Sequence, residues 1–246
     1  MIKLKGDNAY FIVPTQNRYG LSTNQTYDLT ERDFSILVEV KVDWDKMVAD
    51  TPTNEGGIIS KNGQHCGLNA IKLSDGHTYI KATWWITPDQ GGPAVYKDLW
   101  FDVKSNSKYL KVAMTHHKET KTMTLWVDGG SFNTTYPGEI IDYRDSWMWI
   151  GANNSLDNCA EEHRGFFFGE INHVSLHDIP LDDDQIRKAF DIESTEDLDN
   201  DDFQTAAAFS FKEKYMTPYK VFDISSNGNH MILFDKKWMD EDKELI

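Results

Sequence analysis

The chain has 246 residues, 39% of them hydrophobic, and its 40 acidic and 25 basic residues give a formal net charge of −15 at pH 7. This length and composition allow one large β domain or two small ones. The excess of acid argues against a phosphate-binding surface, so we expect no nucleic-acid partner. No apolar run approaches the roughly 18 residues that span a bilayer, and we expect no membrane insertion.

Strands are expected throughout the first half of the chain. Residues 33–42 follow a clear period-two pattern, which predicts a strand. Its apolar face consists of Phe34, Ile36, Val38, Val40 and Val42. Further strands are expected at residues 10–13, 56–61, 67–73 and 79–85. Residues 86–98 contain two prolines and two glycines, which predicts a long loop.

The second half continues the pattern. Strands at 110–114 and 122–127 flank a charged turn over 116–121, and residues 147–152 form another strand. Residues 166–177 read as a half-buried strand, although their alternation is imperfect at Asn172. A further strand is expected over residues 206–211.

A short helix is expected near residues 182–190. Pro180 lacks an N–H donor and ends the preceding strand. Asp182, followed three residues later by Gln185, resembles a capping box. Ile186, Ala189 and Phe190 then fall on one helical face. The acidic run over residues 191–202 predicts a solvated connector.

Several ordered motifs resemble the laminin-G-like domains of the concanavalin A-like lectin/glucanase superfamily. In that family a Gly-x-Ile strand precedes an acidic helix start, as in Gly169-Glu170-Ile171 and residues 181–186. The segments at residues 5–14, 58–61, 125–129 and 149–152 match further family motifs in the same order. The resemblance implies an all-β fold, an antiparallel β-sandwich of the concanavalin A-like jelly-roll type.

The C-terminal segment matches the family in an unusual position. Residues 223–230 resemble an "Asp-x-Ser-Gly-Asn-Gly-Asn-His" motif that usually opens such a domain. We therefore expect a rearranged order, in which residues 1–246 form a single sandwich and residues 203–235 complete its sheets. The alternative is the start of a second, truncated domain, which a lone strand pair would stabilise poorly.

Four aromatic residues flank the predicted Gly/Pro loop: Trp84, Trp85, Tyr96 and Trp100. Exposed aromatic rings stack on sugars and also suit protein contacts, so these residues are the candidate ligand-binding site. Adjacent side chains on a strand point to opposite faces. At least one of Trp84 and Trp85 is therefore expected to belong to the core.

One loop offers candidate calcium ligands. Asp223, Ser225 and Asn227 supply alternating oxygens before Gly228, and laminin-G-like domains often bind calcium at loops. The bidentate Glu of an EF-hand is missing, because Phe234 occupies that position. A structural calcium ion is thus one interpretation, and a tight turn in which Asp and Asn bond the backbone is the other.

Other possible metal and redox sites have weaker support. His173 and His177 lie about 13 Å apart along a strand, too far to share one metal. His116 and His117 are expected in a solvated turn. Cys66 and Cys159 permit one disulfide, and the alternative is two thiols.

Catalysis is not expected. Glycan-cleaving enzymes of this superfamily place paired carboxylates in a Glu-x-Asp-x-x-Glu strand motif. Residues 39–43 come nearest to it, but Lys41 stands where the central acid belongs. We interpret the chain as a non-enzyme, with a diverged glycan-cleaving enzyme as the alternative.

Met1 is followed almost directly by an expected strand, so we expect no export signal, and the functional prediction combines this expectation with the expected fold. We predict a non-catalytic recognition or structural module of a virion, such as a component of a phage capsid, tail or fibre, made in the host cytoplasm. Its expected partners are host-surface glycans or other virion or surface proteins. The sequence is also compatible with an oligomer. The alternative is an extracellular carbohydrate-binding module excised from a secreted protein.

Overall fold

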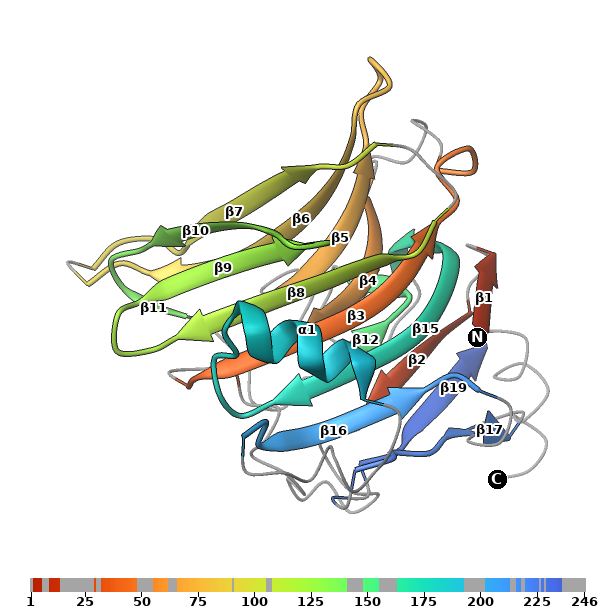
Figure 1. Cartoon of the computed structure of the whole chain (residues 1–246). Helices are drawn as coiled ribbons and strands as arrows, with labels where there is room; N and C mark the ends of the chain where they lie inside the picture. The colour runs from red at the N-terminus through yellow and green to blue at the C-terminus, as the bar shows by residue number, and fades with distance from the viewer. Residues whose placement is uncertain are drawn as a thin grey trace, which may run out of the picture.

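The computed structural model describes residues 2–5, 9–13, 29, 32–47, 55–61, 66–89, 91–104, 108–140, 148–154, 163–192, 202–212, 216–217, 220–225, 227 and 229–235. Over these residues the chain forms two large antiparallel sheets packed face to face, with one short helix outside them (Figure 1). This confirms the predicted fold class. Within this part of the chain, no helix has the length and apolar character needed to cross a membrane.

The front sheet carries the helix on its outer face (Figure 1). Its strands are β1 (Ile2–Lys5), β3 (Phe34–Val42), β8 (Leu110–His117), β9 (Thr122–Val127), β10 (Gly130–Thr135), β15 (Phe168–His177) and β16 (Thr205–Ser210). They follow the order β10–β9–β8–β3–β15. β1 and β16 pair one after the other along the remaining edge of β15.

The back sheet lies behind it. Its strands are β2 (Ala9–Val13), β4 (Glu55–Lys61), β5 (Cys66–Lys72), β6 (Thr78–Thr87), β7 (Val95–Asp102), β11 (Glu139–Ile140), β12 (Met148–Ile150), β17 (Met216–Thr217), β18 (Lys220–Val221) and β19 (Met231–Asp235). Their order is β7–β6–β5–β4–β12–β2–β19–β18–β17, and β11 pairs with the end of β6. A separate pair is formed by β13 (Ala152–Asn154) and β14 (His163–Phe166). β7 is thus an edge strand, and it lies near β9 and β10 of the front sheet.

The core lies between the two sheets. The five alternating apolar residues of β3 all join it, as the period-two pattern predicts. β6 supplies the facing contribution through Ile80, Ala82, Trp84 and Ile86. Burying each larger apolar side chain contributes about 1.5–3 kcal/mol before the entropy cost of ordering the chain. The inward faces of the strands therefore supply most of the stabilising energy.

A β-bulge interrupts the pairing of β3 with β15. Val40 pairs with Ile171 and Glu39 pairs with His173, so Asn172 is the extra residue. The extra residue allows Ile171 and Val174 to reach the core together. The bulge accounts for the imperfect alternation in the sequence, and it leaves His173 on the outer face of the front sheet.

The helix α1 (Asp183–Asp191) packs on that outer face (Figure 1). The carboxylate of Asp182 accepts hydrogen bonds from the N–H groups of Asp184 and Gln185, and the Gln185 side chain accepts one from the Asp182 N–H. This confirms the predicted capping box. A second apolar cluster attaches the helix to the sheet and consists of Leu37, Ala113, Trp126, Leu181, Ile186, Ala189 and Phe203.

Strands from the C-terminal part of the chain extend both sheets. In the front sheet β16 pairs with β15, and in the back sheet β19 pairs with β2. Segments from both ends of the sequence therefore lie side by side, as Figure 1 shows for β2 and β19.

Two local predictions are wrong. The expected loop over residues 86–98 contains the end of β6 and the start of β7, which begins at Val95. β7 alternates between exposed and half-buried residues at a sheet edge, so it lacks the apolar run that marks an inner strand. The expected charged turn at residues 116–121 is shorter, because β8 extends to His117.

Candidate ligand-binding face

The outer face of β6 and β7 brings together three of the four predicted ligand-binding residues. Directly paired residues of antiparallel strands point to the same face of the sheet. Trp85 pairs with Tyr96, and Lys81 pairs with Trp100. Trp85, Tyr96 and Trp100 therefore share one face of the back sheet, on the side away from the core.

These rings belong to a surface that we call the aromatic strip, formed by Tyr79, Trp85, Tyr96 and Trp100. The rings of Trp85 and Tyr96 meet edge to face with centroids 4.4 Å apart, and those of Tyr79 and Trp100 meet in the same way at 5.5 Å. Tyr96 is 48% exposed and Trp100 is 42% exposed, while the other two rings are half-buried. The strip thus presents flat apolar surfaces to solvent.

Trp84 does not belong to this strip. Its side chain points into the sandwich and is fully buried, with its ring 6.2 Å from that of Tyr136. Neighbouring residues of a strand face opposite sides, so exposing Trp85 requires burying Trp84. A ligand on the surface cannot reach this ring. The prediction of a ligand contact for Trp84 is therefore corrected, and Trp84 is a core residue.

An ion pair lies beside Trp100. The Nζ atom of Lys81 is 2.5 Å from Oε1 of Glu55, and both side chains are largely buried. The same Nζ lies 5.4 Å from the centroid of the Trp100 ring. An ammonium group near an aromatic face is attracted by the negative charge density of the ring. Together with the Tyr79 contact, this attraction holds the indole in one orientation on the surface.

Carboxylates alternate with the rings along β7. Asp98 pairs with Thr83 and Asp102 pairs with Tyr79, so both acids lie on the face of the aromatic strip, and both are exposed. Partial burial, followed by the charges of Asp98 and Glu55, raises the pKa of the Tyr96 phenol. That phenol stays a neutral hydrogen-bond donor at neutral pH. The face therefore offers apolar rings, acceptors and a donor side by side.

Sequence reasoning missed Tyr79, Lys81, Asp98 and Asp102. The signal that would have found the two acids is the alternation of residues 95–102, which the loop prediction obscured. The roles of Tyr79 and Lys81 depend on cross-strand register, which the sequence does not reveal.

The predicted calcium ligands lie in a hydrogen-bonded turn against β16. Oδ1 of Asp223 accepts hydrogen bonds from the N–H groups of Ala208 and Ser225 and from the Ser225 hydroxyl, at 2.8–2.9 Å. Its Oδ2 accepts one from the N–H of Asn229 at 2.7 Å. The amide of Asn227 donates to the Thr205 carbonyl at 2.8 Å.

These contacts are those of the tight turn that the sequence left open as the alternative. N–H donors point at both carboxylate oxygens of Asp223, where a cation would need them free of such donors. The turn also satisfies backbone groups along the free edge of β16. The calcium ion itself stays a prediction.

The histidines and cysteines considered as metal or redox sites do not belong to the aromatic strip. His116 bonds to the carbonyl of Arg32 and to the Tyr136 hydroxyl, and burial lowers its pKa. His177 bonds to the Ser175 hydroxyl and the Phe203 carbonyl. Among the described residues, no group of three His, Cys, Asp or Glu side chains could hold a metal ion. Cys66 is buried in β5, and Cys159 lies outside the described residues, so the disulfide stays untested.

Comparison with known proteins finds no matching family model and no matching curated sequence. Solved structures do match. A candidate carbohydrate-binding protein from Bacteroides ovatus aligns over 94% of this chain and 58% of its own length, with a TM-score of 0.56 and 12% identity. The CBM40 domain of the Ruminococcus gnavus IT-sialidase aligns over 76% of this chain and 95% of its own, with a TM-score of 0.51 and 12% identity.

The chain has a concanavalin A-like jelly-roll fold. Domains LG4–5 of the mouse laminin α1 chain also match, with a TM-score of 0.43 and 13% identity over 71% of this chain and 40% of that one. At these identities the likeness concerns the fold alone. The ligand of a protein depends on the residues of its own surface, which differ among proteins of one fold.

Proposed function

We propose that the protein is a non-catalytic glycan-recognition module and that the aromatic strip on β6 and β7 is its binding face. The observation that carries the proposal is the alternation along β7, where Tyr96, Asp98, Trp100 and Asp102 all point outward. Sugar rings have apolar C–H faces and a rim of hydroxyls. Aromatic rings suit the faces, and carboxylates accept hydrogen bonds from the hydroxyls. The carbohydrate-binding proteins of the same fold add support.

The spacing favours an extended oligosaccharide over a single sugar. Tyr96 and Trp100 lie four residues apart on one strand, which corresponds to about 13 Å. Each ring is held by a neighbouring aromatic residue, so little side-chain freedom is lost when a ligand binds. A ligand that contacts both rings must therefore span the strip along the strand direction.

Binding without cleavage fits the placement of the acids. Asp98 and Asp102 are also about 13 Å apart along β7. Paired carboxylates of glycan-cleaving enzymes are separated by about 5 to 9.5 Å. These two exposed acids are too far apart for that chemistry and serve better as hydrogen-bond acceptors. Release of products from bacterial or algal polysaccharides by the purified protein would instead favour the enzyme alternative.

A glycan array tests the proposal. We expect saturable binding of at least one extended glycan, reduced about tenfold or more by Trp100→Ala and by Tyr96→Ala. Phe132→Ala is the matched control, because Phe132 is 55% exposed but lies on β10 of the front sheet. Equal binding by all four proteins, or no binding at all, would contradict the proposal.

The virion setting stays a prediction from the sequence. In that setting the strip would face outward from the particle and contact glycans on the host surface, and an oligomer would present several strips at once. The alternative setting is extracellular. Capsid and tail genes beside the gene for this chain would support the virion, and genes for secreted glycan-degrading enzymes would support the alternative.

A further inference from the structure

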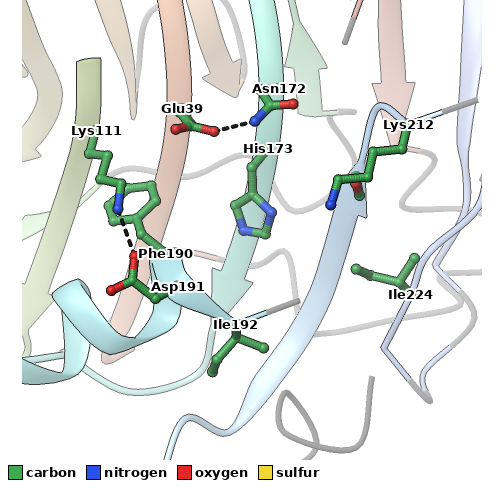
Figure 2. Close-up of a pocket in the computed structure, with 10 residues that line it drawn as sticks. Glu39, Lys111, Asn172, His173, Phe190, Asp191, Ile192, Lys212 and Ile224 are labelled. Atoms are coloured by element: carbon green, nitrogen blue, oxygen red, sulfur yellow. Dashed lines mark hydrogen bonds and ion pairs between the residues drawn. The ribbon is translucent and has the colours of Figure 1, made fainter. Parts of the chain in front are cut away.

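A pocket of about 370 Å³ opens on the outer face of the front sheet (Figure 2). The aromatic strip lies on the outer face of the other sheet. The floor of the pocket is one cross-strand row. Lys111 of β8 pairs with Glu39 of β3, Glu39 pairs with His173 of β15, and His173 pairs with Ser210 of β16. The β-bulge at Asn172 lies beside this row. Bulges often redirect side chains next to functional sites.

The walls come from two other parts of the chain. On one side the end of α1 contributes Phe190 and Asp191, followed by Ile192. On the other side lie Lys212, just after β16, and Ile224. Figure 2 shows the His173 ring pointing into the space between these walls. The pocket thus combines a polar floor with apolar surface on both sides.

His173 has a buried ring nitrogen, Nε2, without a hydrogen-bond partner among the described residues. Burial, followed by the charges of Lys212 and Lys111, lowers the pKa of His173 to about 4. The ring is neutral at physiological pH, so one nitrogen donates a hydrogen bond and the other accepts one. A buried polar atom without a partner is unfavourable, and a ligand hydroxyl would remove that cost.

The charges of the lining are balanced. Two lysines, Lys111 and Lys212, face two acids, Glu39 and Asp191. The Nζ atom of Lys111 lies 2.8 Å from Oδ1 of Asp191, and the side chain of Asn172 donates a hydrogen bond to Glu39. The C-terminal end of α1 adds partial negative charge. Neither an anion nor a cation is strongly favoured, whereas hydroxyls find both donors and acceptors.

We propose that this pocket is a second binding site, for a neutral polyhydroxylated ligand the size of one or two sugar rings. Ligand pockets in proteins range from about 300 to 1,000 Å³, so this pocket is at the small end. Hydroxyls of the ligand bond to His173, Glu39 and Lys212, and its C–H faces pack on Phe190, Ile192 and Ile224. The ligand is either a free monosaccharide or the terminal residue of a glycan.

NMR titration of the histidine ring resonances tests the site. The probes are a panel of neutral monosaccharides, with the anion D-glucuronate and the zwitterion L-serine as comparators that carry charged groups. We expect a neutral sugar to shift the His173 resonances of the wild type saturably. His173→Phe, followed through its backbone amide resonances, should bind the same sugar about tenfold or more weakly. Lys212→Gln, at an exposed position, provides a second variant in case the first does not fold, and it should also weaken binding.

Two controls separate this site from the aromatic strip. Trp100→Ala should leave the His173 titration by free monosaccharides unchanged, and Lys212→Gln should leave unchanged the array binding that Trp100→Ala reduces, so each proposal can fail alone. Tighter binding of the free sugar than of an oligosaccharide ending in it would assign a soluble ligand, and the reverse would assign a glycan terminus. No response to any neutral sugar, a response to the charged probes only, or equal binding by Lys212→Gln would overturn the proposal.

Discussion

The outer faces of the two sheets contrast with each other. On the front sheet, α1 covers part of the strands, and the polar row that includes His173 lies at the bottom of a pocket. On the back sheet, β7 forms an edge whose rings and acids are exposed. Both faces arise from period-two alternation, which the bulge at Asn172 interrupts in β15. The elements packed on a face therefore decide, more than the alternation of its strands, whether the polar residues of that face lie in a recessed pocket or on an open surface.

The largest expected effect separates the inner and outer faces of β6 and β7. Trp84→Ala should lower the free energy of unfolding by about 3–5 kcal/mol, because it leaves a cavity in the core. Trp100→Ala should lower it by less than about 1 kcal/mol, because the side chain is 42% exposed. Urea denaturation of the two variants measures the difference. Similar losses in both would show that the two tryptophans do not differ in burial.

The next effect concerns the free edge of β16 on the front sheet. Asp223→Ala removes the acceptor of four hydrogen bonds and should cost about 2–3 kcal/mol of unfolding free energy. Denaturation of Asp223→Ala beside the wild type gives the value. A cost below about 0.5 kcal/mol would mean that the turn does not stabilise this edge.

The same variant tests the calcium prediction. If the loop binds the ion, calcium raises the unfolding temperature of the wild type relative to EDTA, and Asp223→Ala abolishes that rise. An unfolding temperature that is the same in calcium and in EDTA would leave the loop as a hydrogen-bonded turn alone.

The pH dependence of stability tests whether water reaches His177 on the outer face of the front sheet. Burial lowers the pKa of His177 to about 3, whereas a histidine in the unfolded chain titrates near 6.5. Between these values only the unfolded chain takes up the proton, so stability falls as the pH decreases. Between pH 6.5 and pH 5 the unfolding free energy of the wild type should fall more steeply than that of His177→Gln. The difference in slope should reach up to about 1.4 kcal/mol per pH unit. Parallel pH profiles of the two proteins would show that His177 is solvated in the folded state.

The smallest effect concerns the helix that covers the front sheet. Asp182→Ala removes the N-cap of α1 and should cost about 1 kcal/mol. Asp183→Ala, in the first turn but outside the capping box, is the matched control and should cost less. Thermal unfolding of both variants gives the comparison, and equal costs would show that the cap adds nothing beyond its charge.

Local patterns in the sequence predicted much of the fold. The alternation of β3, the capping box at Asp182 and the opposite directions of Trp84 and Trp85 all follow from local geometry, and each is present in the structure. β7 was missed because it is an exposed edge strand beside a Gly/Pro-rich segment. An edge strand shows little of the apolar pattern that marks an inner strand.

The candidate sites were harder to predict, since they depend on register. The pairing of Lys81 with Trp100 joins neighbouring strands, and the row from Lys111 to Ser210 joins four strands separated by long stretches of sequence. The break in alternation at Asn172 was visible in the sequence as an irregularity. Its consequence, a pocket with His173 at its floor, required the pairing of β15 with β3 and with β16.

The most direct test of the central claim is the affinity of one extended oligosaccharide, chosen from the array, for the wild type and for Trp100→Ala, measured by calorimetry. Trp100→Ala should bind about tenfold or more weakly while unfolding at nearly the same denaturant concentration as the wild type. Unchanged affinity in the folded variant would contradict the assignment of the β6–β7 face as the glycan-binding surface.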